Sequence, residues 1–307
     1  MSLIVISDLH LKNKEPFLSA TKQFLNWLVE NYNEDEFIFL GDTFDSSAPV
    51  WEVYKVFKEF LMQRSHRCTF ILQGNHDTSR NKGCSVSSFN LFNNVKIYQE
   101  EQEVLINNIN CLFLPYKDNY RNYEELAGSY DFIFTHVTPV EAQFANEGIR
   151  FPKLKGMFIH GHTHIQKDYK DEFGNKHIIL GVPISTRHLE DQSHRLIKIK
   201  DDKTIEYIDV PYYFKYETIN YSDEPTFKNN ILNIKNAPNR KLVYEKYKDY
   251  YIRDAGIELL RTEATKEDFN KEFEKSTILD KFKLYAKDKG LSQEVLECCS
   301  LRLSKIM

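Results

Sequence analysis

The sequence has little cysteine, no long apolar run and no strong excess of charge of one sign, and each absence excludes a class of protein. The five cysteines are an odd number, scattered and without a CxxC pair, which argues against a disulfide framework and a zinc–thiolate site. We therefore expect reduced thiols. No stretch has the roughly 18 consecutive apolar residues that a membrane span needs, so we expect no membrane association.

The first residues lack the features of a secretion signal. The opening MSLIVISDLHLKNK has neither a basic start nor a small-residue cleavage site, so we expect a cytoplasmic protein. With 307 residues, of which 41% are hydrophobic, the chain can bury a sizeable core in one large domain or in a large and a small one.

The net charge is −4 and is unevenly spread along the chain. Residues 1–210 carry 23 Lys and Arg against 29 Asp and Glu, which gives −6, and residues 211–307 carry 18 against 16, which gives +2. Neither part is as basic as a protein that binds nucleic acid by charge alone. If DNA is the substrate, metal ions or a partner must help to hold it.

Buried strands alternate with amphipathic helices at the start of the chain. Apolar runs predict strands at residues 3–7, 36–40 and 68–73. Between them, residues 19–32 and 49–61 have apolar side chains at helical spacing, and Pro49 suits the first turn of the second helix. This βαβαβ order predicts a parallel sheet in an α/β domain.

Strands dominate residues 95–210, where eight further apolar runs are separated by turns such as EFGNK and KDDK. We therefore predict two sheets packed together, with helices outside. The segment that starts at Pro211 is the best candidate for a domain boundary. Beyond it, residues 236–261 have strand character, and residues 265–307 predict two or three short amphipathic helices.

Ligand-type side chains follow five of the predicted strands. The carboxyl ends of strands in an open α/β sheet form the crevice where sites are built, so we expect these groups to converge across more than 150 residues. Two pairs in this set, Asp8 with His10 and His162 with His164, are spaced by two residues. An extended backbone would place both members of such a pair on the same side. The full set is Asp8, His10, Asp42, Asp45, Asn75, His76, Asp77, His136, His162 and His164.

The donor types predict two divalent metal ions. Carboxylate, amide oxygen and imidazole groups without thiolate suit borderline-hard metals such as Mn²⁺, Fe²⁺ or Zn²⁺, and of these we expect Mn²⁺. Seven of these side chains are candidate ligands: Asp8, His10, Asp42, Asn75, His136, His162 and His164. They are too many for one tetrahedral ion, but they suffice for two ions about 3.5–4 Å apart that share a carboxylate, an arrangement used for displacement at phosphorus. Gly41, Gly74 and Gly161 stand beside these groups and fit tight turns there.

Histidines outside these motifs have simpler interpretations. We expect His66, His177 and His194 to be surface or packed core residues, and His160 to pack inside its strand. Arg187 and His188 either contact substrate or belong to a solvated loop.

In this order, DLH, GDTFD, GNHD, a lone His136 and GHTH resemble the motifs of the calcineurin-like metallophosphoesterase superfamily, over about residues 1–210. The segments GDTFDSSAP and LGVPISTRHLEDQSHRLIKI further resemble SbcD-type DNA nucleases, including bacteriophage versions. The resemblance implies an α/β fold with a two-sheet metallophosphoesterase sandwich flanked by helices over residues 1–211. A smaller α+β capping domain would follow over residues 212–263, and helices that bind a partner over residues 264–307.

The superfamily's pattern also implies roles for the site residues, with Asp42 as the bridge between two ions. His76 would stabilise the charge that develops on the phosphate or protonate the leaving oxygen, and Asp77 or Asp45 would orient it. Many SbcD-type nucleases have a histidine in place of Asp45. The other ligands would be Asp8, His10 and His164 at one ion, and Asn75, His136 and His162 at the other.

Three classes of function are open on this basis. The first is a DNA nuclease subunit, an exonuclease or endonuclease in DNA repair, recombination or replication. Its expected partners are DNA, a second copy of the chain, and an SbcC-type ATPase whose coiled-coil base binds the C-terminal helices. The second is a stand-alone phosphodiesterase or phosphatase acting on small molecules or phosphoprotein. The third is a metal-binding scaffold without turnover, against which the intact set of ligands argues.

Overall fold

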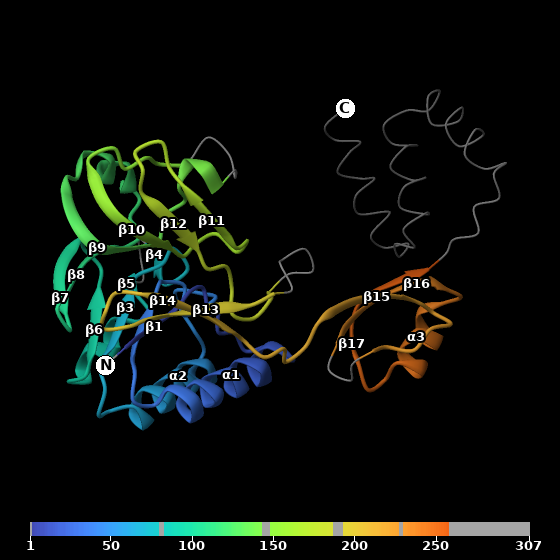
Figure 1. Cartoon of the computed structure of the whole chain (residues 1–307). Coiled ribbons are helices and arrows are strands. Elements are labelled where there is room, and N and C mark those ends of the chain that lie inside the picture. The colour runs from blue at the N-terminus through green and yellow to red at the C-terminus, as the bar shows by residue number, and fades with distance from the viewer. Residues whose placement is uncertain (1, 80–82, 143–147, 187–192, 227–229, 258–307) are drawn as a thin grey trace, which may run out of the picture.

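The chain's structure is a computed structural model that describes residues 2–79, 83–142, 148–186, 193–226 and 230–257. Within these residues, two six-stranded sheets pack together and form the body of the molecule (Figure 1). Helices α1 (Phe17–Tyr32) and α2 (Trp51–Gln63) cover the outer face of the first sheet. The predicted α/β architecture of two packed sheets flanked by helices is confirmed.

The first sheet contains the predicted βαβαβ unit. Its order is β14-β13-β1-β2-β3-β6, in which β1, β2, β3 and β6 are parallel neighbours and β13 and β14 are antiparallel. The bounds are β1 (Leu3–Ile6), β2 (Glu36–Phe39), β3 (Thr69–Leu72), β6 (Val95–Tyr98), β13 (Arg195–Ile199) and β14 (Ile205–Asp209).

Both faces of this sheet are buried, which explains its continuous apolar runs. Ile4 and Phe39 pack toward the two helices, whereas Val5 and Ile38 pack toward the second sheet. The prediction for Pro49 was wrong, because Val50 has an extended backbone (ψ 158°) and α2 begins only at Trp51.

The second sheet has the order β11-β12-β10-β9-β8-β7, with four parallel strands between two antiparallel edges. Its outer face packs against the 3₁₀ helix η2 (Tyr120–Glu125) and nearby loops. The strands are β7 (Gln102–Ile106), β8 (Ile109–Leu114), β9 (Gly128–Thr135), β10 (Leu154–His160), β11 (Lys167–Lys170) and β12 (Lys176–Ile179).

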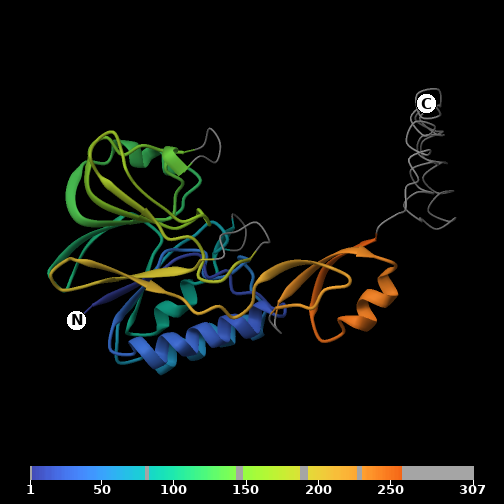
Figure 2. The same cartoon turned by 45° about the vertical axis from the view of Figure 1, so that its right-hand side comes forward.

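A separate sheet of three parallel strands, in the order β15-β16-β17, lies beside this body (Figure 2). Its strands are β15 (Tyr216–Asn220), β16 (Ile231–Ala237) and β17 (Tyr251–Ile257). The strand character predicted for residues 236–261 was wrong over α3 (Arg240–Lys246), where the Asn239 side chain accepts a hydrogen bond from the Leu242 N–H and caps a helix.

The boundaries proposed at residues 211 and 263 stay predictions, and the helices expected over residues 264–307 lie outside the described residues. Among the helices that the structure describes, none has the length and apolar character needed to cross a membrane.

Candidate metal centre

Loops at the carboxyl ends of five strands bring the predicted ligands together. Asp8 and His10 follow β1, and His164 follows β10; ligand atoms of these three side chains all lie within 4.8 Å of one another. The His10 Nε2 atom is 3.0 Å from the His164 Nε2 atom and 3.6 Å from Asp42 Oδ2. The structure thus groups the three residues that the family resemblance assigned to one ion, with Asp42 beside them.

A second group lies on the other side of the Asp42 carboxylate. Asp42, His136 and His162 also offer ligand atoms within 4.8 Å of one another. Asp42 Oδ1 is 3.3 Å from His136 Nε2, and Asn75 Oδ1 is 3.1 Å from that nitrogen and 2.8 Å from His162 Nδ1. The two oxygens of Asp42 therefore face different groups, as a bridging ligand requires.

The surroundings of His136 show that the second group suits a cation. Its Nδ1–H donates to the Leu40 carbonyl, so its Nε2 carries only a lone pair when the ring is neutral. That lone pair would face two acceptor oxygens, from Asp42 and Asn75. A metal ion held by these side chains would turn this repulsive arrangement into coordination.

The titration behaviour of the buried groups agrees with this conclusion. Burial alone would lower the pKa of His136, but the charge of Asp42 and a hydrogen bond to it raise this pKa to about 9. Burial likewise opposes ionisation of Asp42, yet His136 and His10 hold the pKa of its carboxyl well below the usual range. Burial, and then the charge of His136, lower the pKa of His162 to about 4, which keeps its ring neutral and able to bind metal.

The backbone at these ligands is not extended, contrary to the expectation from their spacing. Asp8, His10, Asp42 and His162 all have positive φ, between 45° and 69°. This conformation is uncommon outside glycine, and it is retained where surrounding bonds hold it. Here the His162 N–H donates to both oxygens of Asp8 (3.0 Å each), and the His10 N–H donates to the Asp42 carbonyl (2.8 Å).

The glycines beside the site are needed mainly for space. Only Gly41 of the three has a left-handed backbone, at φ +91°, as the tight-turn prediction implied. A Cβ on Gly74 would lie 2.1 Å from Asp42 Oδ1, and one on Gly161 would lie 2.8 Å from His136 Nδ1. Both distances are shorter than real Cβ contacts, so the side chains of Asp42 and His136 occupy the space that a larger residue would need.

His76 lies at the edge of the centre and is half-buried. Its backbone N–H donates to Asp42 Oδ1 (2.8 Å), and its ring centroid is 4.8 Å from that of His10. The Nδ1 atom is 3.1 Å from the backbone carbonyl oxygen of Asp45. His10, Asp42 and His76 also satisfy the distances of a ligand group, so the geometry permits either ligation or contact with substrate.

The carboxylates of Asp77 and Asp45 contact groups other than the His76 ring. Fully buried Asp77 accepts hydrogen bonds from the N–H groups of Thr43, Phe44 and Gly74 (3.1–3.2 Å) and so joins the loops after β2 and β3. Burial and the nearby charge of Asp42 raise the pKa of Asp77 to about 7. The Asp45 carboxylate is 3.4 Å from Nδ1 of His10, a candidate metal ligand, whereas the Asp45 backbone carbonyl contacts the His76 ring.

A family model for calcineurin-like phosphoesterases matches residues 1–166, more than half of the chain. The chain belongs to the calcineurin-like phosphoesterase family. Members of this family are hydrolases with a centre of two metal ions, and the two groups of ligands that share Asp42 fit such a centre in this phosphoesterase. No curated protein sequence matches the chain.

Several solved structures are similar to this phosphoesterase. One is an archaeal phosphodiesterase, with 15% identity and a TM-score of 0.40, covering 68% of this chain and 99% of that one. A dimetal phosphatase from Danio rerio has 14% identity and a TM-score of 0.43, covering 69% and 99%. A Vps29 mutant from Entamoeba histolytica has 12% identity and a TM-score of 0.34, covering 68% and 99%.

The remaining histidines of the phosphoesterase behave as expected where they are described. His160 is buried, with its Nε2 atom 2.8 Å from His177 Nδ1, and it belongs to neither ligand group. Arg187 and His188 lie outside the described residues. Sequence reasoning missed Tyr116, whose ring is 6.0 Å from that of His162, although its position just after β8, at another carboxyl end, was an available signal.

Proposed function

We propose that the chain is a Mn²⁺-dependent DNA nuclease of the SbcD type, which hydrolyses the phosphodiester backbone. The observation that carries the proposal is a groove of about 530 Å³ that borders the metal centre at Asp45. Lys12 and Lys14 line it from the body, and Arg253 lines it from the small sheet. Asp45 and Glu15 also line the groove, and Lys12 lies 3.5 Å from Asp45, so Lys14 and Arg253 are the cations that we expect to contact a phosphate. A phosphatase of small molecules does not need a further groove with basic side chains beside the metal centre.

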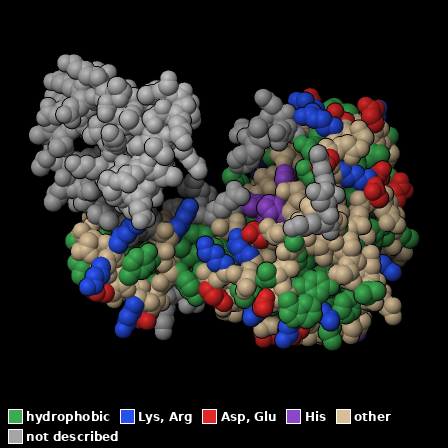
Figure 3. Space-filling view, turned by 180° about the vertical axis from the view of Figure 1, so that it is seen from behind, with side chains coloured by type: hydrophobic (Ala, Val, Ile, Leu, Met, Phe, Trp, Pro, Cys, Tyr) green, Lys and Arg blue, Asp and Glu red, His purple; other side chains and the backbone are tan. Residues whose placement is uncertain are grey.

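The groove has the chemistry of a site for a nucleic-acid strand. Besides its cations it contains two aromatic rings of the small sheet, Tyr216 and Tyr251. Proteins that bind single-stranded nucleic acid without reading its sequence usually place cationic side chains along the phosphate backbone and aromatic rings on which the bases stack. In Figure 3, Lys and Arg side chains lie close to the histidines of the site, on the side of the small sheet.

The chain's own residues can perform the hydrolysis as follows. Asp8, His10, Asp42 and His164 would hold one ion, and Asn75, His136, His162 and the shared Asp42 the other. When bound, these ions supply Lewis-acid stabilisation and activation of water. The Leu40 carbonyl orients His136, and the Asp45 carboxylate orients His10, so that the Nε2 atom of each ring points into the centre.

His76 completes the site on the substrate side. Because its Nδ1–H donates to the Asp45 carbonyl, a second proton on Nε2 makes the ring an imidazolium. In that form it can stabilise negative charge on the phosphate and give a proton to the leaving oxygen.

We further propose that residues 264–307 bind an SbcC-type ATPase. The amphipathic pattern of this segment supports the proposal, and so does the net charge of −6 over residues 1–210, because a partner would supply the positive charge that the first part of this chain lacks. The ATPase would thereby hold DNA near the metal centre.

The test measures Mn²⁺-dependent hydrolysis by the full chain of linear single-stranded and duplex DNA, bis-p-nitrophenyl phosphate and p-nitrophenyl phosphate. We expect cleavage of DNA and of the diester, and we expect Lys14→Gln and Arg253→Gln to raise KM for DNA and to weaken its salt dependence. Hydrolysis of the small diester should not change. Lys96→Gln is the matched control, because Lys96 is an exposed side chain on β6 and does not line the groove. Hydrolysis of the small substrates without cleavage of DNA would favour a stand-alone phosphodiesterase or phosphatase.

A further inference from the structure

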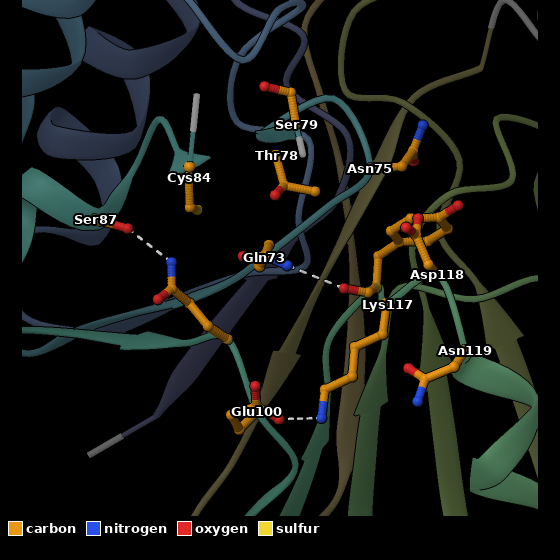
Figure 4. Close-up of a pocket in the computed structure, with 13 residues that line it drawn as sticks. Gln73, Asn75, Thr78, Ser79, Cys84, Ser87, Glu100, Lys117, Asp118 and Asn119 are labelled. Carbon is orange, nitrogen blue, oxygen red and sulfur yellow. Dashed lines mark hydrogen bonds and ion pairs between the residues drawn. The ribbon is translucent and has the colours of Figure 1, made fainter. Parts of the chain in front are cut away.

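A second cavity, of about 810 Å³, borders the metal centre (Figure 4). It lies between the loop after β3, the short strands β4 (Thr78–Ser79) and β5 (Gly83–Cys84), and the loop after β8. Asn75 lines this cavity, and its Oδ1 atom is also 3.1 Å from His136 Nε2 and 2.8 Å from His162 Nδ1. A molecule in the cavity would therefore be adjacent to a group held at the metal centre.

The cavity is poorly suited to a second phosphate in addition to one held at the metal centre. Lys117, its cationic side chain, is paired with both Glu100 and Glu101. Asp118 adds a further negative charge to the lining. A phosphate would meet no excess of positive charge here, so the charge of the lining favours a neutral polar group over an anion.

The rest of the lining offers hydrogen-bond donors and acceptors beside an aromatic ring. Amide and hydroxyl groups can each donate and accept, as the edges of nucleobases do. Tyr116 provides the ring, and its backbone carbonyl is held by Gln73 Nε2 at 3.0 Å. Besides Asn75, the neutral polar side chains are Gln73, Thr78, Ser79, Ser87, Gln99 and Asn119, of which Gln99 Nε2 donates a hydrogen bond to Ser87 Oγ at 2.7 Å (Figure 4).

We propose that this cavity binds the nucleobase of the nucleotide whose phosphate reacts at the metal centre. The inference rests on the proposed function, and it adds a base subsite next to the phosphate site. Tyr116, whose ring is 6.0 Å from the His162 ring, stands between the two and stacks on the base. Rotatable hydroxyl and amide groups can pair with any of the four bases, so the subsite supports binding without selecting a sequence.

Calorimetry in the presence of Mn²⁺ tests the proposal by comparing the 5′- and 3′-monophosphates of thymidine with deoxyribose 5-phosphate, which has no base. Stacking on an aromatic ring is worth about 1–3 kcal/mol per base, so we expect at least one thymidine monophosphate to bind roughly tenfold more tightly than the sugar phosphate. Tyr116→Ala should abolish this advantage, Tyr116→Phe should retain it, and Gln99→Ala should reduce it.

Tyr244→Ala is the control, because Tyr244 is 56% exposed on α3 and does not line the cavity. Equal binding of nucleotide and sugar phosphate would overturn the proposal, as would an advantage that Tyr116→Ala leaves unchanged. A base advantage without cleavage of DNA would support the subsite and reject the nuclease. Cleavage of DNA without a base advantage would support the nuclease and reject the base subsite.

Discussion

Gly74→Ala is the most direct test of the geometry around Asp42. The added Cβ would lie 2.1 Å from Asp42 Oδ1 and 2.2 Å from the Asp42 backbone nitrogen. Rotation of the carboxylate could relieve the first contact but not the second, so one of the two loops must move. Ordinary contact begins near 3.4 Å, which means a displacement of more than 1 Å.

The expected loss follows from that displacement. Asp42 is shared by both ligand groups, so its movement should weaken both metal sites together. A misplacement of about 1 Å at a reacting centre costs on the order of 10²-fold in rate. We therefore expect kcat/KM for bis-p-nitrophenyl phosphate to fall about 10²-fold, and overpacking to lower the free energy of unfolding by roughly 1–3 kcal/mol.

Three measurements on the same protein test this: metal content per chain, diester hydrolysis and thermal unfolding. The matched control is Gly174→Ala in the turn between β11 and β12, where a Cβ meets nothing within 4 Å but the backbone has φ +85°. This variant should lose about 1 kcal/mol of stability through backbone strain and keep its metal and its rate. Wild-type metal content and rate in Gly74→Ala would refute the reasoning.

Three further predictions concern the centre and the C-terminal segment. Asp42→Asn should lower metal content at both sites, whereas His10→Ala should mainly empty one; two bound ions and full activity in Asp42→Asn would exclude a bridge. His76→Ala should keep its metals but lose roughly 10²–10⁴-fold in rate, and loss of metal would instead make His76 a ligand. Removal of residues 265–307 should preserve diester hydrolysis but abolish co-purification with the cognate ATPase, and continued co-purification would contradict the docking role.

The succession of strands and helices in the βαβαβ unit and the convergence of polar side chains at the strand ends were readable from the sequence, because both depend on local patterns. Strands buried on both faces need continuous apolar runs, and β1, β2 and β3 have them. A polar residue directly after such a run marks the carboxyl end of a strand. Asp8, Asp42 and His136 could therefore be placed at one edge of the fold before any distance was known.

Only the tertiary structure decided how these residues act on one another. Asp77 stands next to His76 in the sequence, yet its carboxylate binds N–H groups of Thr43, Phe44 and Gly74. Those partners lie on two loops whose approach depends on the packing of β2 against β3. The left-handed backbone of Asp8 and the contact of Gly74 with Asp42 have the same origin, since bonds between separate loops impose them. Local pattern thus determined which side chains reach the edge of the sheets, and long-range packing determined which of them touch.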